Sequence, residues 1–143
     1  MTSPPFDVIG DVHGCRSELV TLLDRLGWQG VRHPEGRTAV FVGDLVDRGP
    51  DTPGVLQLVM EMVEAGTALC VAGNHEAKLA RALEGAHVRT AHGLAESLEQ
   101  LAREPEAFRH SARRFMTGLP TQLQLDEGRL VIAHAGLREE LHG

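Results

Sequence analysis

Cysteines and long apolar runs are scarce in this 143-residue sequence. The only two cysteines, Cys15 and Cys70, are too few for a disulfide framework and too isolated for a thiolate zinc site. No apolar run approaches the roughly 18 residues of a membrane span, and the N-terminal segment lacks the basic and apolar regions of a signal peptide. We therefore expect a cytoplasmic protein with no membrane partner, in which Cys70 belongs to the core.

Positive charge is also in short supply. The chain has 14 Lys and Arg against 20 Asp and Glu, a net charge of −6, which is the wrong sign for holding long nucleic acid by counterion release. An anionic substrate would therefore need a local basic patch or bound cations. Hydrophobic residues at 42% and charged residues at 24% are close to globular averages, so we expect a single domain over residues 1–143.

Three short apolar runs, at residues 6–11, 38–44 and 68–74, each end in glycine followed by a polar residue, which is typical of a buried strand and its exit loop. Between them, Leu, Val and Met at helical spacing predict amphipathic helices over residues 19–26 and 55–63. The order β-α-β-α-β predicts an α/β fold with a mostly parallel sheet and flanking helices.

The second half predicts a different organisation. Residues from about 76 to 118 read as a helical insertion in three pieces, interrupted at residues 85–90 and at Pro105. Residues 122–135 alternate like a β-hairpin, which we expect to return to the sheet.

Polar motifs follow the predicted strands: GDVHG at residues 10–14, GDLVDRG at 43–49, GNHE at 73–76 and HAG at 134–136. In an open α/β sheet, ligands bind beyond the carboxyl ends of the strands, so these loops should converge on one crevice. The crevice would hold Asp11, His13, Asp44, Asp47, Arg48, Asn74, His75 and His134.

Such a mixture of carboxylate, imidazole and amide suits Mn²⁺, Fe or Zn²⁺ better than Ca²⁺. Two ions about 3.5 to 4 Å apart need a bridging carboxylate, and Asp44 on the central exit is our choice. Arg48 offers a planar, bidentate donor to a phosphate beside the ions. The alternative is that these residues only cap loops, with Asp47 and Arg48 forming an exposed ion pair.

In this order the four motifs resemble the calcineurin-like metallophosphoesterases, in the branch that includes serine/threonine phosphoprotein phosphatases and dinucleoside tetraphosphatases. The resemblance covers residues 6–137. It implies a two-metal phosphohydrolase using Mn²⁺, with Fe, Zn²⁺ or Ni²⁺ as alternatives. The residues implied for one ion are Asp11, His13 and Asp44, and those for the other are Asp44, Asn74 and His134.

The same resemblance implies catalytic roles for three residues. His75 would protonate the leaving oxygen, Asp47 would orient His75, and Arg48 would bind the phosphate. His92, in the HGLAES segment, is a further candidate for substrate binding, with a helix-start role as its alternative. The basic run at residues 108–115 could contact a nucleic-acid backbone, although a solvated helix face is the more common explanation.

A narrower resemblance covers residues 33–79 and the segment HGLAESLEQL. These are similar to the phosphatase module of bacterial polynucleotide kinase-phosphatases, RNA-repair enzymes that remove 2′- and 3′-phosphates from nucleic-acid ends. The kinase and ligase modules of that family are absent, since no GxxxxGK[ST] motif occurs. The family also has a histidine ligand well beyond HAG, so we expect a C-terminally incomplete module that binds its second ion weakly.

We therefore expect nucleic-acid ends as the first substrate class, phosphoserine or phosphothreonine as the second, and dinucleoside polyphosphates as the third. The rival hypothesis is a non-catalytic, metal-binding remnant.

Overall fold

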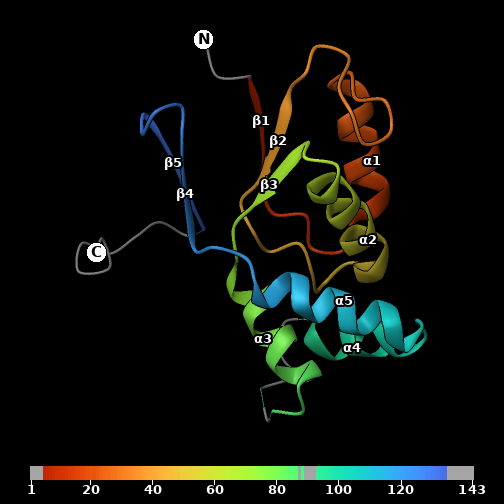
Figure 1. Ribbon diagram of the computed structural model, residues 1–143. Helices are drawn as coiled ribbons and strands as arrows, with labels where there is room; N and C mark the ends of the chain where they lie inside the picture. The colour runs from red at the N-terminus through yellow and green to blue at the C-terminus, as the bar shows by residue number, and fades with distance from the viewer. Residues whose placement is uncertain (1–4, 87, 89–92, 135–143) are drawn as a thin grey trace.

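A three-stranded parallel sheet forms the centre of the molecule in the computed structural model, which describes residues 5–86, 88 and 93–134. The strands β1 (Phe6–Ile9), β2 (Thr38–Phe41) and β3 (Ala68–Cys70) lie in the order β1-β2-β3 (Figure 1). Both pairings are parallel. The predicted strands are confirmed, and the parallel pairing brings their exit loops to one edge of the sheet.

Two helices cover one face of this sheet, as the periodicity predicted (Figure 1). They are α1 (Arg16–Arg25) and α2 (Thr52–Glu64). The Asp51 side chain caps α2 by accepting a hydrogen bond from the backbone N–H of Gly54, at 2.9 Å. The largest cluster of buried side chains lies between these helices and the sheet and continues into the helices that follow β3.

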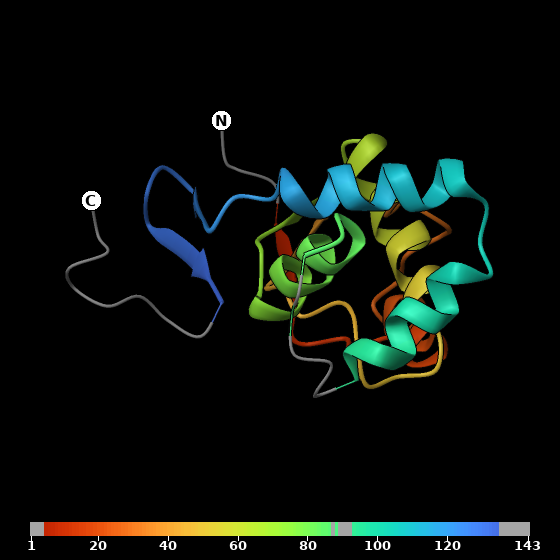
Figure 2. The same cartoon turned by 90° about the horizontal axis from the view of Figure 1, so that it is seen from below.

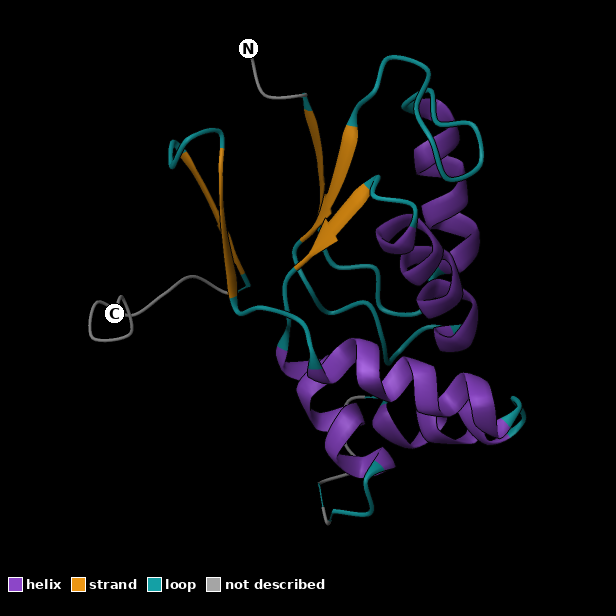
Figure 3. Cartoon of the chain, viewed as in Figure 1, coloured by secondary structure: helices purple, strands orange, loops and turns teal. Residues whose placement is uncertain are grey.

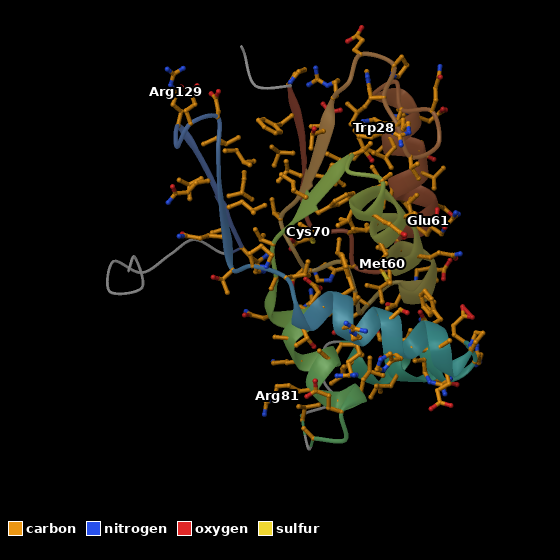
Figure 4. All side chains as sticks on the ribbon, viewed as in Figure 1. Trp28, Met60, Glu61, Cys70, Arg81 and Arg129 are labelled. Carbon is orange, nitrogen blue, oxygen red and sulfur yellow. The ribbon has the colours of Figure 1, made fainter. Side chains whose placement is uncertain are left out.

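Cys70 and Trp28 both belong to that cluster (Figure 4). Burial raises the pKa of the Cys70 thiol far above its ordinary value, so this side chain behaves as a small apolar residue. The expectation of a core cysteine is confirmed.

Three helices follow β3 and gather at the end of the sheet toward which the strands run (Figures 2 and 3). They are α3 (Asn74–Leu83), α4 (Leu94–Ala102) and α5 (Glu106–Thr117). Helices α4 and α5 contact both α2 and α3, so these helices form one layer beside the strand exits. None of the helices in the described ranges is long and apolar enough to cross a membrane.

The predicted hairpin forms from β4 (Gln122–Leu125) and β5 (Leu130–Ala133), but it does not return to the sheet by pairing. In the described part of the chain it is a separate two-stranded sheet. Its apolar face packs instead against the side of the parallel sheet that the helices leave open, with Ile132 against Val40 and Val71 (Figure 1). Alternating apolar residues predict a strand with one buried face. They do not show whether that strand pairs with the edge of a sheet or packs face to face against it.

Candidate metal and phosphate site

The loops after β1 and β2 are joined to each other by their backbones. The N–H groups of Val12 and His13 donate to the carbonyl of Asp44, at 3.1 and 2.9 Å, and the N–H of Gly14 donates to Leu45 at 2.8 Å. These backbone hydrogen bonds bring the side chains of Asp11, His13 and Asp44 close together. Strand exits that are distant in sequence are therefore adjacent in space, as predicted.

Asp44 lies at the centre of the resulting cluster. It is only 6% exposed, and its Oδ2 atom is 2.8 Å from Nε2 of His134 and 4.0 Å from Nε2 of His13. Asp11 lies 3.6 Å from the His13 ring and 3.8 Å from the His134 ring. Two sets of possible ligand atoms share Asp44. One set is Asp11, Asp44 and His134, the other is His13, Asp44 and His75, and the atoms of each set lie within 4.8 Å of one another.

The two histidines beside Asp44 are held in the tautomer that a metal needs. Nδ1–H of His13 donates to the carbonyl of Val46 at 3.0 Å, and Nδ1–H of His134 donates to the carbonyl of Val42 at 2.9 Å. A carbonyl can only accept, so the lone pair of each neutral ring lies on Nε2, the nitrogen that faces Asp44. Metal-binding histidines are oriented by the same kind of outer hydrogen bond. The residues present therefore fit divalent metal ions.

Asn74 is the first residue of α3 and is exposed. Its neighbour Gly73 lies tightly against Asp44, because a Cβ atom at Gly73 would fall 2.3 Å from the Asp44 carboxylate. The start of α3 is thus brought to the cluster. The structure brings together Asp11, His13, Asp44 and His134, with Asn74 at the adjoining start of α3. That these five residues bind metal, and how they divide into two sets, stays a prediction.

A second pair of side chains lies beside this cluster. Nδ1–H of His75 donates to Oδ2 of Asp47 at 2.7 Å, and the His75 ring lies edge-on to the His13 ring with centroids 4.9 Å apart. Asp47 is 2% exposed, so it is not the exposed partner of Arg48 that the alternative predicted. The bond to Asp47 leaves Nε2 of His75 as the ring nitrogen available to the crevice.

Arg48 follows directly and is exposed, where its guanidinium is accessible to an anion. His92 lies outside the described residues. The basic run on α5 is largely occupied: Arg109 donates to the carbonyls at the end of α4, and Arg113 pairs with Glu84 at 3.2 Å. This occupancy favours a structural role for these two arginines over contact with a nucleic-acid backbone.

Glu76 is a residue of the site that the sequence interpretation missed. It is fully buried, and its carboxylate accepts hydrogen bonds from the N–H groups of Asp44, Gly73 and Leu45 at 2.7, 2.9 and 2.9 Å. Burial raises the pKa of Glu76, while these N–H groups act in the opposite direction. The signal available in the sequence was a Glu three residues after the N-cap of a helix.

Comparisons with known proteins agree with this geometry. The family model for calcineurin-like phosphoesterases matches residues 4–142. A bis(5′-nucleosyl)-tetraphosphatase PrpE [asymmetrical] of Geobacillus sp. (strain WCH70) is 43% identical over 96% of this chain and 59% of its own length. The protein of the same name in Bacillus subtilis (strain 168) is 40% identical over 94% of this chain and 59% of its own length. The chain thus spans about three fifths of these relatives.

Solved structures give the same picture of the fold. A structure provisionally described as a diadenosine tetraphosphatase superposes with a TM-score of 0.67 at 26% identity, over 96% of this chain and 56% of that one. A serine/threonine phosphatase from Saccharomyces cerevisiae superposes with a TM-score of 0.72 at 20% identity, over 96% and 40% of the two chains. At 20% identity the second comparison supports the fold alone. Polynucleotide kinase-phosphatases are not among these relatives.

Proposed function

We propose a function from the premise that the chain belongs to the calcineurin-like phosphoesterase family. In this proposal it is a metal-dependent phosphohydrolase that cleaves the polyphosphate bridge of dinucleoside polyphosphates. The observation that carries the proposal is the pair of histidines, His13 and His134, whose Nδ1–H groups are bound to carbonyls so that both Nε2 atoms face Asp44.

The residues that would hold two divalent ions are Asp11, His13, Asp44, Asn74 and His134, with Asp44 shared. When bound, the ions would neutralise phosphoryl oxygens and lower the pKa of water towards neutrality. Mn²⁺ is our first choice, with Fe, Zn²⁺ or Ni²⁺ as alternatives. The three aspartates of the crevice would repel a phosphate without this compensating charge.

The protein's own groups would bind the phosphate and transfer a proton. Arg48, exposed at the rim, would bind phosphoryl oxygens through its planar guanidinium. His75 would deliver a proton from Nε2 to a basic leaving oxygen. Asp47, bound to the other ring nitrogen at 2.7 Å, would hold the ring in place and stabilise its protonated form.

Two observations support dinucleoside polyphosphates over nucleic-acid ends. The curated relatives are named tetraphosphatases, at up to 43% identity. Two of the three arginines that could have bound a nucleic-acid backbone are engaged within the protein, Arg109 by carbonyls and Arg113 by Glu84, and Arg114 alone is left exposed. Nucleic-acid ends, first in our ranking from the sequence, thus become the alternative, together with phosphoprotein substrates.

The test is hydrolysis of diadenosine tetraphosphate by the purified chain with Mn²⁺, followed by anion-exchange chromatography. Asymmetric cleavage of a four-phosphate bridge must give equal amounts of AMP and ATP, and we expect this result, abolished by excess EDTA. A 3′-phosphorylated oligonucleotide and a phosphoserine peptide serve as rival substrates. Faster release of phosphate from either rival, or full activity in EDTA, would overturn the proposal.

A further inference from the structure

We propose that helix α4 is a positioning element for the reaction, and that Ser97 and Gln100 hold the turn that carries Asp47 and Arg48. This inference rests on the proposed function. It concerns a helix whose side chains do not touch the metal cluster and whose predicted role was only that of an insertion. The turn in question, residues 47–52, joins the exit of β2 to the start of α2.

Gln100 bridges the two sides of this turn with a single side-chain amide. Its Oε1 atom accepts a hydrogen bond from the backbone N–H of Thr52 at 2.7 Å. Its Nε2 group donates to the backbone carbonyl of Gly49 at 3.2 Å. The amide has one donor side and one acceptor side, which is what a backbone N–H and a backbone C=O together require.

Ser97, one helical turn earlier, reaches Asp47 through one intermediate. The hydroxyls of Ser97 and Thr52 share a hydrogen bond of 2.9 Å, and the Thr52 oxygen accepts from the backbone N–H of Asp47 at 3.2 Å. Ser97 and Thr52 are 1% and 0% exposed, so water does not compete for these bonds. A buried chain of hydrogen bonds thus runs from α4 to the residue that holds His75.

The turn needs such support because its backbone is strained. Asp47 and Arg48 are consecutive residues with φ of 72° and 74°, a conformation that costs about 1–2 kcal/mol for a residue with a side chain. Strained residues persist only where the surroundings determine them. The N-cap residue of α4, Gly93, adds a third contact, because a Cβ atom there would fall 2.2 Å from the backbone nitrogen of Arg48.

The support from α4 is separate from the support of the metal cluster. Asp44 and Leu45 are held by Glu76 of α3, and His134 is held by the carbonyl of Val42. Loss of Ser97 or Gln100 should therefore displace Asp47, Arg48 and the bound His75 ring while leaving Asp44 and His134 in place. A general loss of folding would affect both groups of residues together.

The first test reads the position of His75 without relying on activity. We would record ¹H–¹⁵N spectra of the imidazole groups in the metal-free and Zn²⁺-loaded states. The spectra would be compared for the two test variants, Ser97→Ala and Gln100→Ala, and for the control variant Glu99→Gln. Glu99 lies on the same helix with a side chain 70% exposed. We expect the His75 Nδ1–H resonance to shift or broaden in both test variants and to stay unchanged in the control. The His134 resonance, whose Nδ1–H is bound to the carbonyl of Val42, should keep its position.

The second test is kinetic, with phenyl phosphate as substrate and Mn²⁺ as metal. Misplacement of catalytic groups by an ångström can cost on the order of 100-fold, so we expect Gln100→Ala to lower kcat about 10- to 100-fold with unchanged metal stoichiometry. In an Asp47→Asn background the same substitution should cost less than about twofold, because both act through one group. Ser97→Ala, a smaller change, covers the case in which Gln100→Ala does not fold.

The outcomes separate the two hypotheses. An inactive wild-type chain would overturn the proposed function. The spectra alone would then test whether α4 positions Asp47 and His75. An active wild-type chain whose two variants keep both the wild-type His75 resonance and the wild-type kcat would overturn the role of α4. Equal disturbance of the His134 and His75 resonances would also overturn it, because the effect would then be a general loosening of the fold.

Discussion

Four residues of the crevice have backbone conformations that their side chains disfavour. His13, Asp44, Asp47 and Arg48 have φ values of 44°, 51°, 72° and 74°, in the left-handed region. Each costs free energy, and such residues concentrate at functional sites where neighbouring contacts determine them. Conformational propensities favour glycine in this region. The sequence therefore predicted which side chains meet, but not the backbone turns that orient them.

Most of the predicted site residues follow strands directly, whereas Glu76, which was not predicted as a site residue, lies in the first turn of α3. Asp11, Asp44 and His134 were expected to meet because the loops beyond strand ends converge. Glu76 was missed because two of its three hydrogen bonds come from Asp44 and Leu45 on another loop, and the spacing within GNHE indicates only the bond from Gly73.

Replacing His75 should separate substrates by their leaving groups. We expect His75→Ala to lower kcat for phenyl phosphate on the order of 100-fold, because proton delivery contributes about 10²- to 10⁴-fold. The loss for p-nitrophenyl phosphate, whose leaving group needs no proton, should be under about tenfold. Steady-state kinetics of both esters with Mn²⁺ measures this ratio, and metal content should be unchanged. His110→Ala on the exposed side of α5 is the matched control.

Diadenosine tetraphosphate extends the same measurement. Its leaving group is an acidic phosphate, so it should resemble p-nitrophenyl phosphate in its response to His75→Ala. Equal losses on phenyl phosphate and p-nitrophenyl phosphate would remove His75 from the acid role.

At the scale of elements, the parallel pairing of three strands performs most of the assembly. Once β1, β2 and β3 are adjacent and parallel, their exits must share an edge, and helices α3 to α5 then cover it. Helical and strand periods predicted these elements because each buries one face. The contacts between α4 and the turn at residues 47–52 were not predictable, because polar side chains at helical spacing usually face solvent.

Glu76→Gln should loosen the junction between α3 and the β2 exit. The substitution places an NH₂ group where one carboxylate oxygen accepts from Asp44 and Gly73 or where the other accepts from Leu45, so a buried N–H loses its acceptor. We expect a loss of about 2–4 kcal/mol in the free energy of unfolding and weaker metal binding. Urea unfolding and metal titration test both.

The control for this change is Glu84→Gln at the end of the same helix. Glu84 is partly exposed, and within the described ranges its only ion pair is with Arg113, so the loss should be under about 1 kcal/mol. Equal destabilisation by the two substitutions would show that the buried carboxylate has no special role.

The opposite end of the sheet offers a pH-dependent contact. Asp7 on β1 accepts hydrogen bonds from Trp28 at 2.9 Å and Arg37 at 2.8 Å. Burial alone would raise the pKa of Asp7, but the bonds from Arg37 and Trp28 outweigh it and hold the pKa below 3.8. A carboxyl whose pKa is lowered by folding stabilises the folded state at pH values above its ordinary pKa. This stabilisation is lost as the pH falls through the lower pKa of the folded state.

Asp7→Asn should therefore lower the urea midpoint at pH 7, and the difference from wild type should shrink as the pH falls below 3.8. The conservative change keeps an acceptor for Trp28. Asp24→Asn, an exposed carboxylate on α1, should leave the midpoint unchanged at every pH. A pH-independent deficit for Asp7→Asn would mean that shape and not charge is responsible.

At the scale of the whole molecule, the sheet is covered by helices on one face and by a hairpin on the other (Figures 1 and 4). The helix layer was predicted from periodicity, whereas the hairpin was expected in the wrong place. Its four apolar side chains, Leu123, Leu125, Leu130 and Ile132, form a face and not an edge, and this favours packing across the sheet. The hairpin in turn delivers His134 to Asp44 at 2.8 Å.

Because that cluster draws on loops from the whole chain, metal binding should stabilise the entire fold. Ions that bind only the folded state add about 2.7 kcal/mol at a free concentration 100 times Kd, which corresponds to a rise in Tm of roughly 5–10 °C. We expect this rise with Mn²⁺ in a thermal melt of the wild-type chain. Asp44→Ala should lose it, because Asp44 is shared by both sets of donors.

Net charge is the competing explanation, since a chain of charge −6 attracts divalent cations without a specific site. Asp24→Ala removes the same charge from the exposed face of α1 and should keep the full Mn²⁺-dependent rise. An equal rise in all three proteins would assign the stabilisation to the surface. A rise lost only in Asp44→Ala, together with two metal equivalents in wild type, requires the ions to bind where the strand exits meet.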